Sequence, residues 1–206
     1  SPHRVTPPCR HFGECGGCQT QHLDYAEQLV FKTKSVASVL KHALDCEEVP
    51  VHPCIGPEEP WGTRSRIALQ VSDRHGQLQG GLFRRRSREL VEIEECPVSD
   101  PKGFEVAQAA VEAFRGIGVE AWDYRTDGGT VRTALVRANA KGDSELTIIV
   151  RRRVDSEVRE FRKADTGAVS TFLNINDAGR ERLIGWQTSH LAGARGFESE
   201  VAGKRL

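Results

Sequence analysis

Three cysteines lie close together near the start of the chain, in a spacing that suits metal binding. Residues 9–18 run Cys-Arg-His-Phe-Gly-Glu-Cys-Gly-Gly-Cys, so five residues separate Cys9 from Cys15 and two separate Cys15 from Cys18. A two-residue gap lets two sulfurs face one small volume, and the Gly16-Gly17 pair has no side chains to hold the backbone away from it. Clustered thiolates are ligands of zinc and of iron–sulfur clusters. The segment is therefore predicted to be a metal-binding loop.

Two other uses of these thiols are less favoured. A redox-active Cys-x-x-Cys pair follows a hydrophobic strand and precedes a helix, and residues 1–8 contain no such strand. Disulfides need an oxidising compartment, and no secretory leader is visible, although a mature chain would have lost one. A metal centre remains the preferred interpretation.

Three thiolates need a fourth ligand, for which the chain offers Cys46, Cys54, Cys96, His11 and His22. Cys96 precedes Pro97, the pairing found at the remote ligand of bacterial ferredoxin clusters, and it follows a predicted strand at 89–93. Cys46 follows a predicted helix and is expected to be a small buried apolar group. Cys54 is harder to dismiss, but Cys96 is the preferred fourth ligand.

The same residues resemble the cluster segment of the iron–sulfur RNA uracil-5 methyltransferases. The resemblance rests on these motifs: His11-Phe12-Gly13, Cys15-Gly16-Gly17-Cys18, Gln21-His22-Leu23, Tyr25, Gln28-Leu29, Lys32, Trp61-Gly62-Thr63-Arg64-Ser65-Arg66, Glu94-Glu95-Cys96-Pro97 and Asn174-Ile175-Asn176. That family methylates carbon 5 of a uridine with S-adenosylmethionine, mainly in large-subunit (23S) ribosomal RNA. The resemblance implies a 4Fe–4S cluster on Cys9, Cys15, Cys18 and Cys96.

The resemblance also implies what the chain lacks. In that family a methyltransferase domain follows, with a glycine-rich cofactor loop, a cysteine nucleophile and a carboxylate base, and many members carry a small barrel upstream. This sequence ends at Leu206 and has no cysteine after Cys96. We therefore expect a cluster-binding loop and helix at 1–45, a central RNA-binding domain at 46–206, and no methyl transfer by this chain alone.

The remaining pattern predicts an α+β fold with a mostly antiparallel sheet, flanking helices and an irregular N-terminal loop. Asp24 is the predicted cap of a helix whose apolar stripe is expected to pack on the core. Asp100-Pro101 begins a second predicted helix, which ends at Gly116 and Gly118. Strands are predicted at 67–71, 78–83, 90–93, 131–138, 145–150 and 169–175, with a short helix at 156–163 and a bulge at Gly80-Gly81.

Charge restricts how RNA can bind. The chain has 29 Lys and Arg against 29 Asp and Glu, so any contact with phosphate needs a local patch. One candidate is the predicted loop that contains Arg84, Arg85, Arg86 and Arg88, whose alternative interpretation is a solvated hairpin end. Arg64 and Arg66 are a second candidate, because alternation places both on one strand face. In the resembling family such arginines lie near the RNA path.

Three classes of function fit these features. The first is the RNA-recognition part of a uracil-5 methyltransferase, which is expected to act on ribosomal RNA in the cytoplasm. The second is a non-catalytic zinc module that binds nucleic acid or a protein, and the third is an iron–sulfur electron carrier. We expect no catalytic residue within the chain. No membrane partner is expected, because no apolar run approaches the ~20 residues that span a bilayer.

Overall fold

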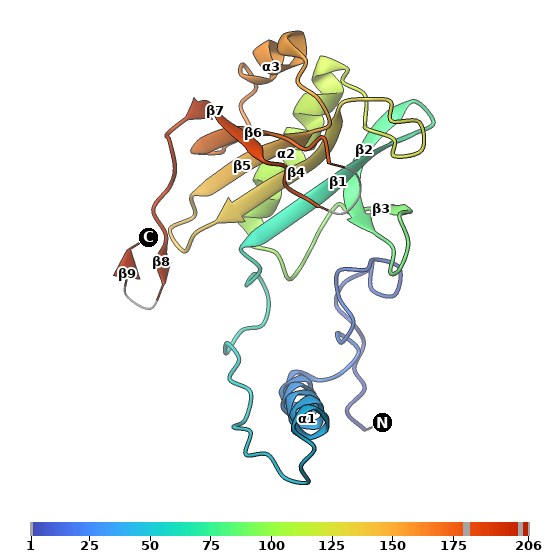
Figure 1. Cartoon of the computed structure of the whole chain (residues 1–206), viewed down its shortest axis with the longest axis vertical. Helices are drawn as coiled ribbons and strands as arrows, with labels where there is room; N and C mark the ends of the chain where they lie inside the picture. Colours follow the sequence, from blue (N-terminus) through green and yellow to red (C-terminus); the bar gives the residue numbers. More distant parts are fainter. Residues whose placement is uncertain (1, 179–181, 202–203, 206) are drawn as a thin grey trace.

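The computed structural model describes residues 2–178, 182–201 and 204–205, and its main element is a seven-stranded sheet (Figure 1). The strand order is β3-β2-β1-β4-β5-β6-β7, and among these strands the β5–β6 pair is parallel while the other neighbours are antiparallel. The predicted α+β fold with a mostly antiparallel sheet is confirmed. The strands are β1 (Arg66–Arg74), β2 (Gln77–Phe83), β3 (Leu90–Glu92), β4 (Val131–Ala138), β5 (Ser144–Val150), β6 (Ser170–Ile175) and β7 (Gln187–Gly193), with a separate β8 (Glu200–Val201) and β9 (Lys204–Arg205) ladder.

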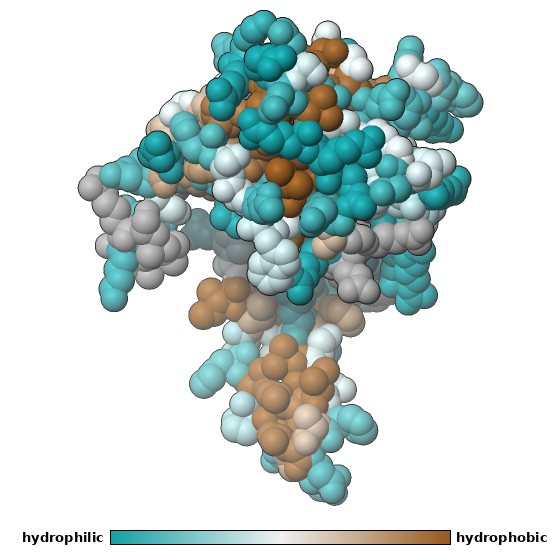
Figure 2. Space-filling view, turned by 45° about the horizontal axis from the view of Figure 1, so that its top comes forward, coloured by the Kyte–Doolittle hydropathy of each residue, from teal (hydrophilic) through white to brown (hydrophobic). Residues whose placement is uncertain are grey.

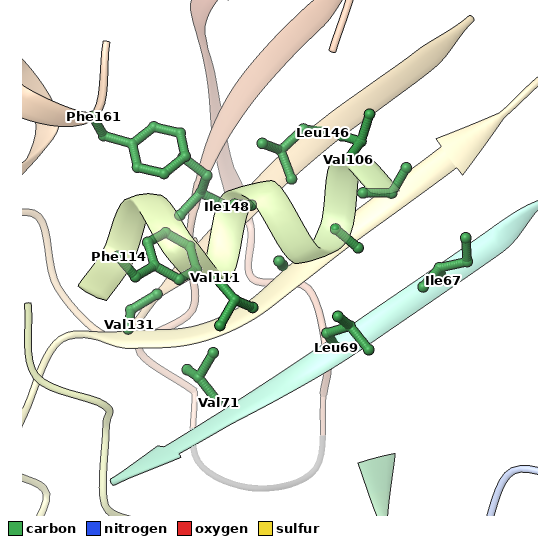
Figure 3. Packing of buried hydrophobic residues seen from close by; sticks show 14 of the residues in the cluster. Ile67, Leu69, Val71, Val106, Val111, Phe114, Val131, Leu146, Ile148 and Phe161 are labelled. Atoms are coloured by element: carbon green, nitrogen blue, oxygen red, sulfur yellow. The ribbon is translucent and has the colours of Figure 1, made fainter. Parts of the chain in front are cut away.

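One face of the sheet packs against helix α2 (Pro101–Ile117) to form the core (Figure 3). The helix begins as predicted, because the Asp100 carboxylate accepts a hydrogen bond from the Gly103 N–H at 2.7 Å. Gly118 ends it in the left-handed conformation, with φ of 75°. Helix α3 (Asp155–Phe161) joins the same layer, where its Phe161 ring lies 5.3 Å from that of Phe114.

The two glycines in β2 allow close packing and do not mark a bulge. The β1–β2 register is unbroken from the Gln70–Gly81 pair to the end of the hairpin, so the predicted bulge is wrong. A Cβ at Gly80 would lie 2.6 Å from a methyl of Val111, and a Cβ at Gly81 would lie 2.0 Å from the Val91 carbonyl oxygen. Glycine therefore lets helix α2 and strand β3 approach this strand closely.

Helix α1 (Tyr25–Leu44) lies apart from the sheet, at the far end of the molecule (Figure 1). Its start is as predicted, since the Asp24 carboxylate accepts the Glu27 N–H at 2.8 Å. None of its residues is buried, and the expectation that it packs on the core is wrong. Its N-terminal turns instead contact the proline-rich segment at 47–62, where a Cβ at Gly56 would lie 2.1 Å from the Tyr25 hydroxyl oxygen. Residues of α2, and none of α1, belong to the core cluster.

The apolar side chains of α1 are therefore largely exposed, and they form the brown surface at the lower end of Figure 2. Val39 and Leu44 are 67% and 63% exposed. Within the described residues no helix combines the length and the apolar character needed to cross a membrane.

Candidate metal centre and nucleic-acid surface

The cysteine loop is attached to the end of strand β2 through backbone contacts. The Gly16 N–H donates to the Phe83 carbonyl oxygen at 2.9 Å, and Cys15 forms an isolated antiparallel bridge with Arg84. A Cβ at Gly16 would lie 2.7 Å from the Phe83 oxygen, which is backbone and cannot swing away. Glycine at position 16 is therefore needed for the loop to lie this close to the sheet.

Inside the loop, backbone groups are directed at sulfur. The Gly17 N–H points at the Cys15 Sγ, with 3.3 Å between nitrogen and sulfur. The Cys15 N–H in turn donates to the His11 carbonyl oxygen at 2.9 Å, which closes a tight turn between the first two cysteines. An N–H donated to sulfur, as from Gly17, stabilises a thiolate and is typical of sulfur ligands in metal centres.

Cys96 reaches the same place from the end of strand β3. The nearby Trp-Gly-Thr-Arg motif holds its turn in position, because the Gly62 N–H donates to the Pro97 carbonyl oxygen and the Arg64 N–H donates to that of Val98, each at 2.8 Å. The buried Ser99 lies in the same turn, and its hydroxyl donates to the Cys96 Sγ at 3.1 Å.

The four predicted metal ligands, Cys9, Cys15, Cys18 and Cys96, line one cavity of about 20 Å³. Burial raises the pKa of the Cys15 thiol, the hydrogen bond from Gly17 opposes that rise, and repulsion from the three other cysteines adds to it. Burial also raises the pKa of the Cys9 thiol, and repulsion from Cys96 and Cys18 adds to the rise. A backbone hydrogen bond from His11 acts in the opposite direction and lowers that pKa. The four sulfurs therefore lie close enough together to interact electrostatically.

The cavity has the donor chemistry of a four-cysteine metal centre. Four thiols suit either zinc or an iron–sulfur cluster. As the side chains lie, no group of three or more His, Cys, Asp or Glu residues in the described part of the chain is arranged to hold a metal ion. Gln21 also lines this cavity and is 6% exposed, and its Oε1 has no hydrogen-bond partner among the described residues.

The other candidates for the fourth ligand lie in different places. Cys46 is exposed just beyond the end of α1, so the expectation that it is buried is wrong. Cys54 is half-buried, and its N–H donates to the Thr33 hydroxyl of α1 at 2.8 Å. Neither lines the cavity. His11 does line it, whereas the His22 ring packs against Phe12 with 5.6 Å between ring centroids.

The two arginines predicted to form one RNA-contacting pair have different surroundings. Arg64 precedes β1 and lines the cysteine cavity, and its guanidinium donates to the Gly17 carbonyl oxygen at 3.1 Å. Arg66 is exposed at the start of β1 and lies opposite Arg137 of β4. Arg66 is therefore the one of the pair whose side chain is open to an RNA partner.

The arginines of the β2–β3 loop also differ from one another in their partners and exposure. Arg84 forms ion pairs with Glu14 at 3.7 Å and Glu89 at 3.1 Å, which tie the loop to the cysteine segment and to itself. Arg85 and Arg86 are exposed and form no ion pair with described residues. Arg88 points elsewhere: its Cζ lies 5.3 Å from the centroid of the Tyr124 ring.

That contact belongs to a cleft that the sequence interpretation missed. It has a volume of about 830 Å³ and is lined by aromatic and arginine side chains from four segments of the chain, among them Arg88, Trp122, Tyr124, Arg125, Arg132 and Arg182. The one sequence signal was the Trp-x-Tyr-Arg run at 122–125, between α2 and β4.

Comparison with known proteins finds relatives over nearly the whole chain. No family model matches it. An uncharacterised RNA methyltransferase of Listeria monocytogenes is 34% identical over 209 residues, which cover 98% of this chain and 46% of that protein. A protein of the same description from Halalkalibacterium halodurans is 30% identical, over 94% of this chain and 43% of the relative. The chain spans about half the length of the curated relatives that it matches.

The fold is also present in a solved structure. The crystal structure of the Pyrococcus abyssi tRNA (uracil-54, C5)-methyltransferase in complex with S-adenosyl-L-homocysteine superposes with a TM-score of 0.71 and 24% sequence identity. The match covers 100% of this chain and 45% of that one. The two proteins therefore share the fold described above.

Proposed function

We propose that this chain is the cluster-bearing, RNA-recognising part of an S-adenosylmethionine-dependent RNA uracil-C5 methyltransferase that acts on 23S ribosomal RNA in the cytoplasm. The observation that carries the proposal is the cavity where Cys9, Cys15 and Cys18 meet Cys96, about eighty residues away in the sequence. The relatives named RNA methyltransferases and the fold shared with a tRNA uracil methyltransferase support it. In this proposal residues 1–45 form the cluster loop and its helix, and 46–206 form the RNA-binding domain.

Cys9, Cys15, Cys18 and Cys96 would hold a 4Fe–4S cluster, which when bound supplies a cross-link between the N-terminal loop and the sheet. The chain's own groups prepare the site for negatively charged sulfur. The Gly17 N–H and the Ser99 hydroxyl are already directed at Sγ atoms, at 3.3 and 3.1 Å. Gln21 adds a polar side chain to the same cavity, where it is buried and its Oε1 has no hydrogen-bond partner among the described residues.

Methyl transfer and S-adenosylmethionine binding belong, in this proposal, to a domain outside these 206 residues. The sequence has no cysteine after Cys96 to serve as nucleophile, and no glycine-rich cofactor loop that follows a strand. The role of this chain is to bind RNA and to present it. RNA contact is assigned to Arg66, Arg85, Arg86 and Arg88, which are exposed, and Arg64 and Arg84 support the loop between them.

Anaerobic purification followed by iron, acid-labile sulfide and zinc analysis tests the proposal. We expect iron and sulfide in equal amounts, together with broad visible absorbance. Stoichiometric zinc in colourless protein would contradict the cluster and favour the zinc interaction module. A cluster with a reversible potential in protein that binds no RNA would favour the electron carrier instead.

A further inference from the structure

The large cleft beside the arginine loop lies on the sheet face that α2 does not cover. Gln70 and Ser72 of β1 line it together with part of Val71, and they alternate with Leu69 and Val71, which belong to the buried core. The cleft is distinct from the cysteine cavity, although Phe83 connects the two: it lines the cleft, and its carbonyl oxygen accepts the Gly16 N–H.

Aromatic rings in the cleft are paired with guanidinium groups. The Arg132 Cζ lies 4.1 Å from the centroid of the Trp122 ring. The Cζ atoms of Arg88 and Arg125 lie 5.3 and 5.4 Å from the centroid of Tyr124. Rings and planar cations at such distances provide the flat faces on which unstacked nucleobases stack in proteins that bind single strands.

Trp122 is held in position before any ligand arrives. Its indole N–H donates to the Asp127 carboxylate at 2.8 Å, and the same carboxylate accepts two hydrogen bonds from Arg151, at 2.8 and 3.1 Å. Its backbone N–H donates to the Val131 carbonyl oxygen at 2.7 Å. An aromatic platform fixed in this way loses little conformational entropy when a ligand binds.

The acidic groups of the cleft are already engaged within their own loops. Glu89 pairs with Arg84 at 3.1 Å, and the Asp73 and Asp123 carboxylates each accept a backbone N–H of a nearby turn. Arg88 and Arg125, by contrast, form no salt bridge with described residues. Their positive charge is therefore available to an anionic ligand such as a phosphate.

The floor of the cleft offers a hydrogen-bond donor suited to a base edge. The Thr133 hydroxyl donates to the Gln70 Oε1 at 3.0 Å, which fixes the orientation of the Gln70 amide. The amide NH₂ of Gln70 has no hydrogen-bond partner in the described part of the chain. Gln amides commonly recognise base edges in protein–nucleic acid complexes.

One rim of the cleft is secured by buried asparagines of the Asn-Ile-Asn motif. The Asn176 amide donates to the carbonyl oxygens of Arg182 and Leu183, at 2.7 and 3.0 Å. Arg182 and Leu183 both line the cleft. The Asn-Ile-Asn motif therefore positions Arg182 and Leu183, which a ligand in the cleft would contact.

We propose that this cleft binds a single-stranded segment of the substrate RNA, with an unstacked base against Tyr124 and Trp122 and its phosphates at Arg88 and Arg125. The proposal deepens the function proposed above and rests on it for the identity of RNA as the ligand. A single strand is required because a duplex keeps its base faces covered. The volume of about 830 Å³ lies within the ~300–1,000 Å³ range of ligand sites and accommodates a nucleotide.

The test is a titration of the 206-residue chain with a fluorescent single-stranded RNA and with the same sequence as a duplex, at several salt concentrations. Tyr124→Leu removes the ring but keeps apolar bulk, and we expect it to weaken single-strand binding by about tenfold. Arg125→Ala, an exposed position that the fold does not need, should lower the salt slope by roughly 0.7. Arg159→Ala on α3 is the matched control, because Arg159 is exposed and does not line the cleft.

Two outcomes would overturn the cleft as an RNA site. One is unchanged single-strand affinity in both Tyr124→Leu and Arg125→Ala, and the other is duplex binding as tight as single-strand binding. Metal analysis of the same preparations separates this proposal from the broader one. If the protein carries the iron–sulfur cluster and Tyr124→Leu leaves its RNA affinity unchanged, the cleft proposal alone is refuted. If the protein carries zinc and Tyr124→Leu weakens single-strand binding, the cleft proposal is supported and the methyltransferase assignment is refuted.

Discussion

The Arg64 guanidinium donates a hydrogen bond to the Gly17 carbonyl oxygen, with 3.1 Å between the two atoms. This bond joins the approach to β1 to the backbone between Cys15 and Cys18, and Arg64 also lines the cavity that the cysteines share. The arginine that precedes the sheet therefore holds the cysteine loop against it. Arg66, two residues further on, has no such role.

The two arginines can be separated by single substitutions. Arg64→Ala should lower the free energy of unfolding by about 1.5–3 kcal/mol, because it removes a hydrogen bond from a charged, half-buried group. It should also shorten the time for which the protein retains metal in the presence of a chelator. Arg66→Ala should leave both quantities close to those of the parent and weaken RNA binding. Equal metal loss in the two variants would contradict this division of roles.

The ligand assignment is tested with two cysteines of different location. Cys96→Ser should abolish metal retention, because Cys96 lines the shared cavity, while Cys46→Ser should retain nearly all of it, because Cys46 is exposed beyond α1. The measurement is metal per chain after anaerobic desalting. Similar losses from both substitutions would refute the assignment of Cys96 as the fourth ligand.

Two glycines should respond to alanine in opposite directions. Gly16→Ala places a Cβ 2.7 Å from the Phe83 carbonyl oxygen, so the loop must move away from the sheet, and we expect lower stability and weaker metal retention. Gly116→Ala lies in helix α2, where a Cβ meets nothing within 4 Å. It should raise the free energy of unfolding by up to ~1 kcal/mol through helix propensity. Chemical denaturation of both variants provides the comparison, and a stabilising Gly16→Ala would show that the loop is not packed as described.

Local rules predicted much of the sheet and of α2 from sequence. Alternation at Ile67, Leu69 and Val71 identified the buried face of β1, and the Asp100-Pro101 pair identified the start of α2. Local rules could not predict what α1 packs against, because an apolar stripe does not show whether another helix already covers the sheet. The four cysteines that spacing and resemblance proposed as ligands do line one cavity, although their role as ligands stays a prediction. The aromatic cleft was missed, because its residues come from distant segments whose sequence has no shared pattern.

Asp127 is expected to affect stability at low pH. Its hydrogen bonds with Arg151 and Trp122 lower the pKa of its carboxyl from 3.8 to about 2. A depressed folded-state pKa contributes stability above the unfolded value, and this contribution is lost as pH falls from about 4 to about 2. Asp127→Asn should therefore unfold at a lower temperature than the parent at neutral pH, with the difference shrinking across that window. Because the carboxylate is exposed, added salt should reduce the difference as well. A difference independent of pH would contradict the ion pair.

In the β2–β3 loop, Arg84 is engaged with Glu14 and Glu89, whereas Arg85 and Arg86 are exposed. If the exposed pair contacts phosphate, Arg85→Ala/Arg86→Ala should weaken RNA binding and reduce the slope of log affinity against log salt by roughly 1.4, or 0.7 for each contact with a single strand. Arg84→Ala should instead loosen the loop, with a larger effect on stability than on the salt slope. The measurement is a set of RNA titrations between low and physiological salt, with thermal unfolding of each variant alongside. An unchanged affinity and slope in the double variant would mean that these two arginines form a solvated hairpin end, and RNA contact would then rest on Arg66 and on the cleft beyond Arg88.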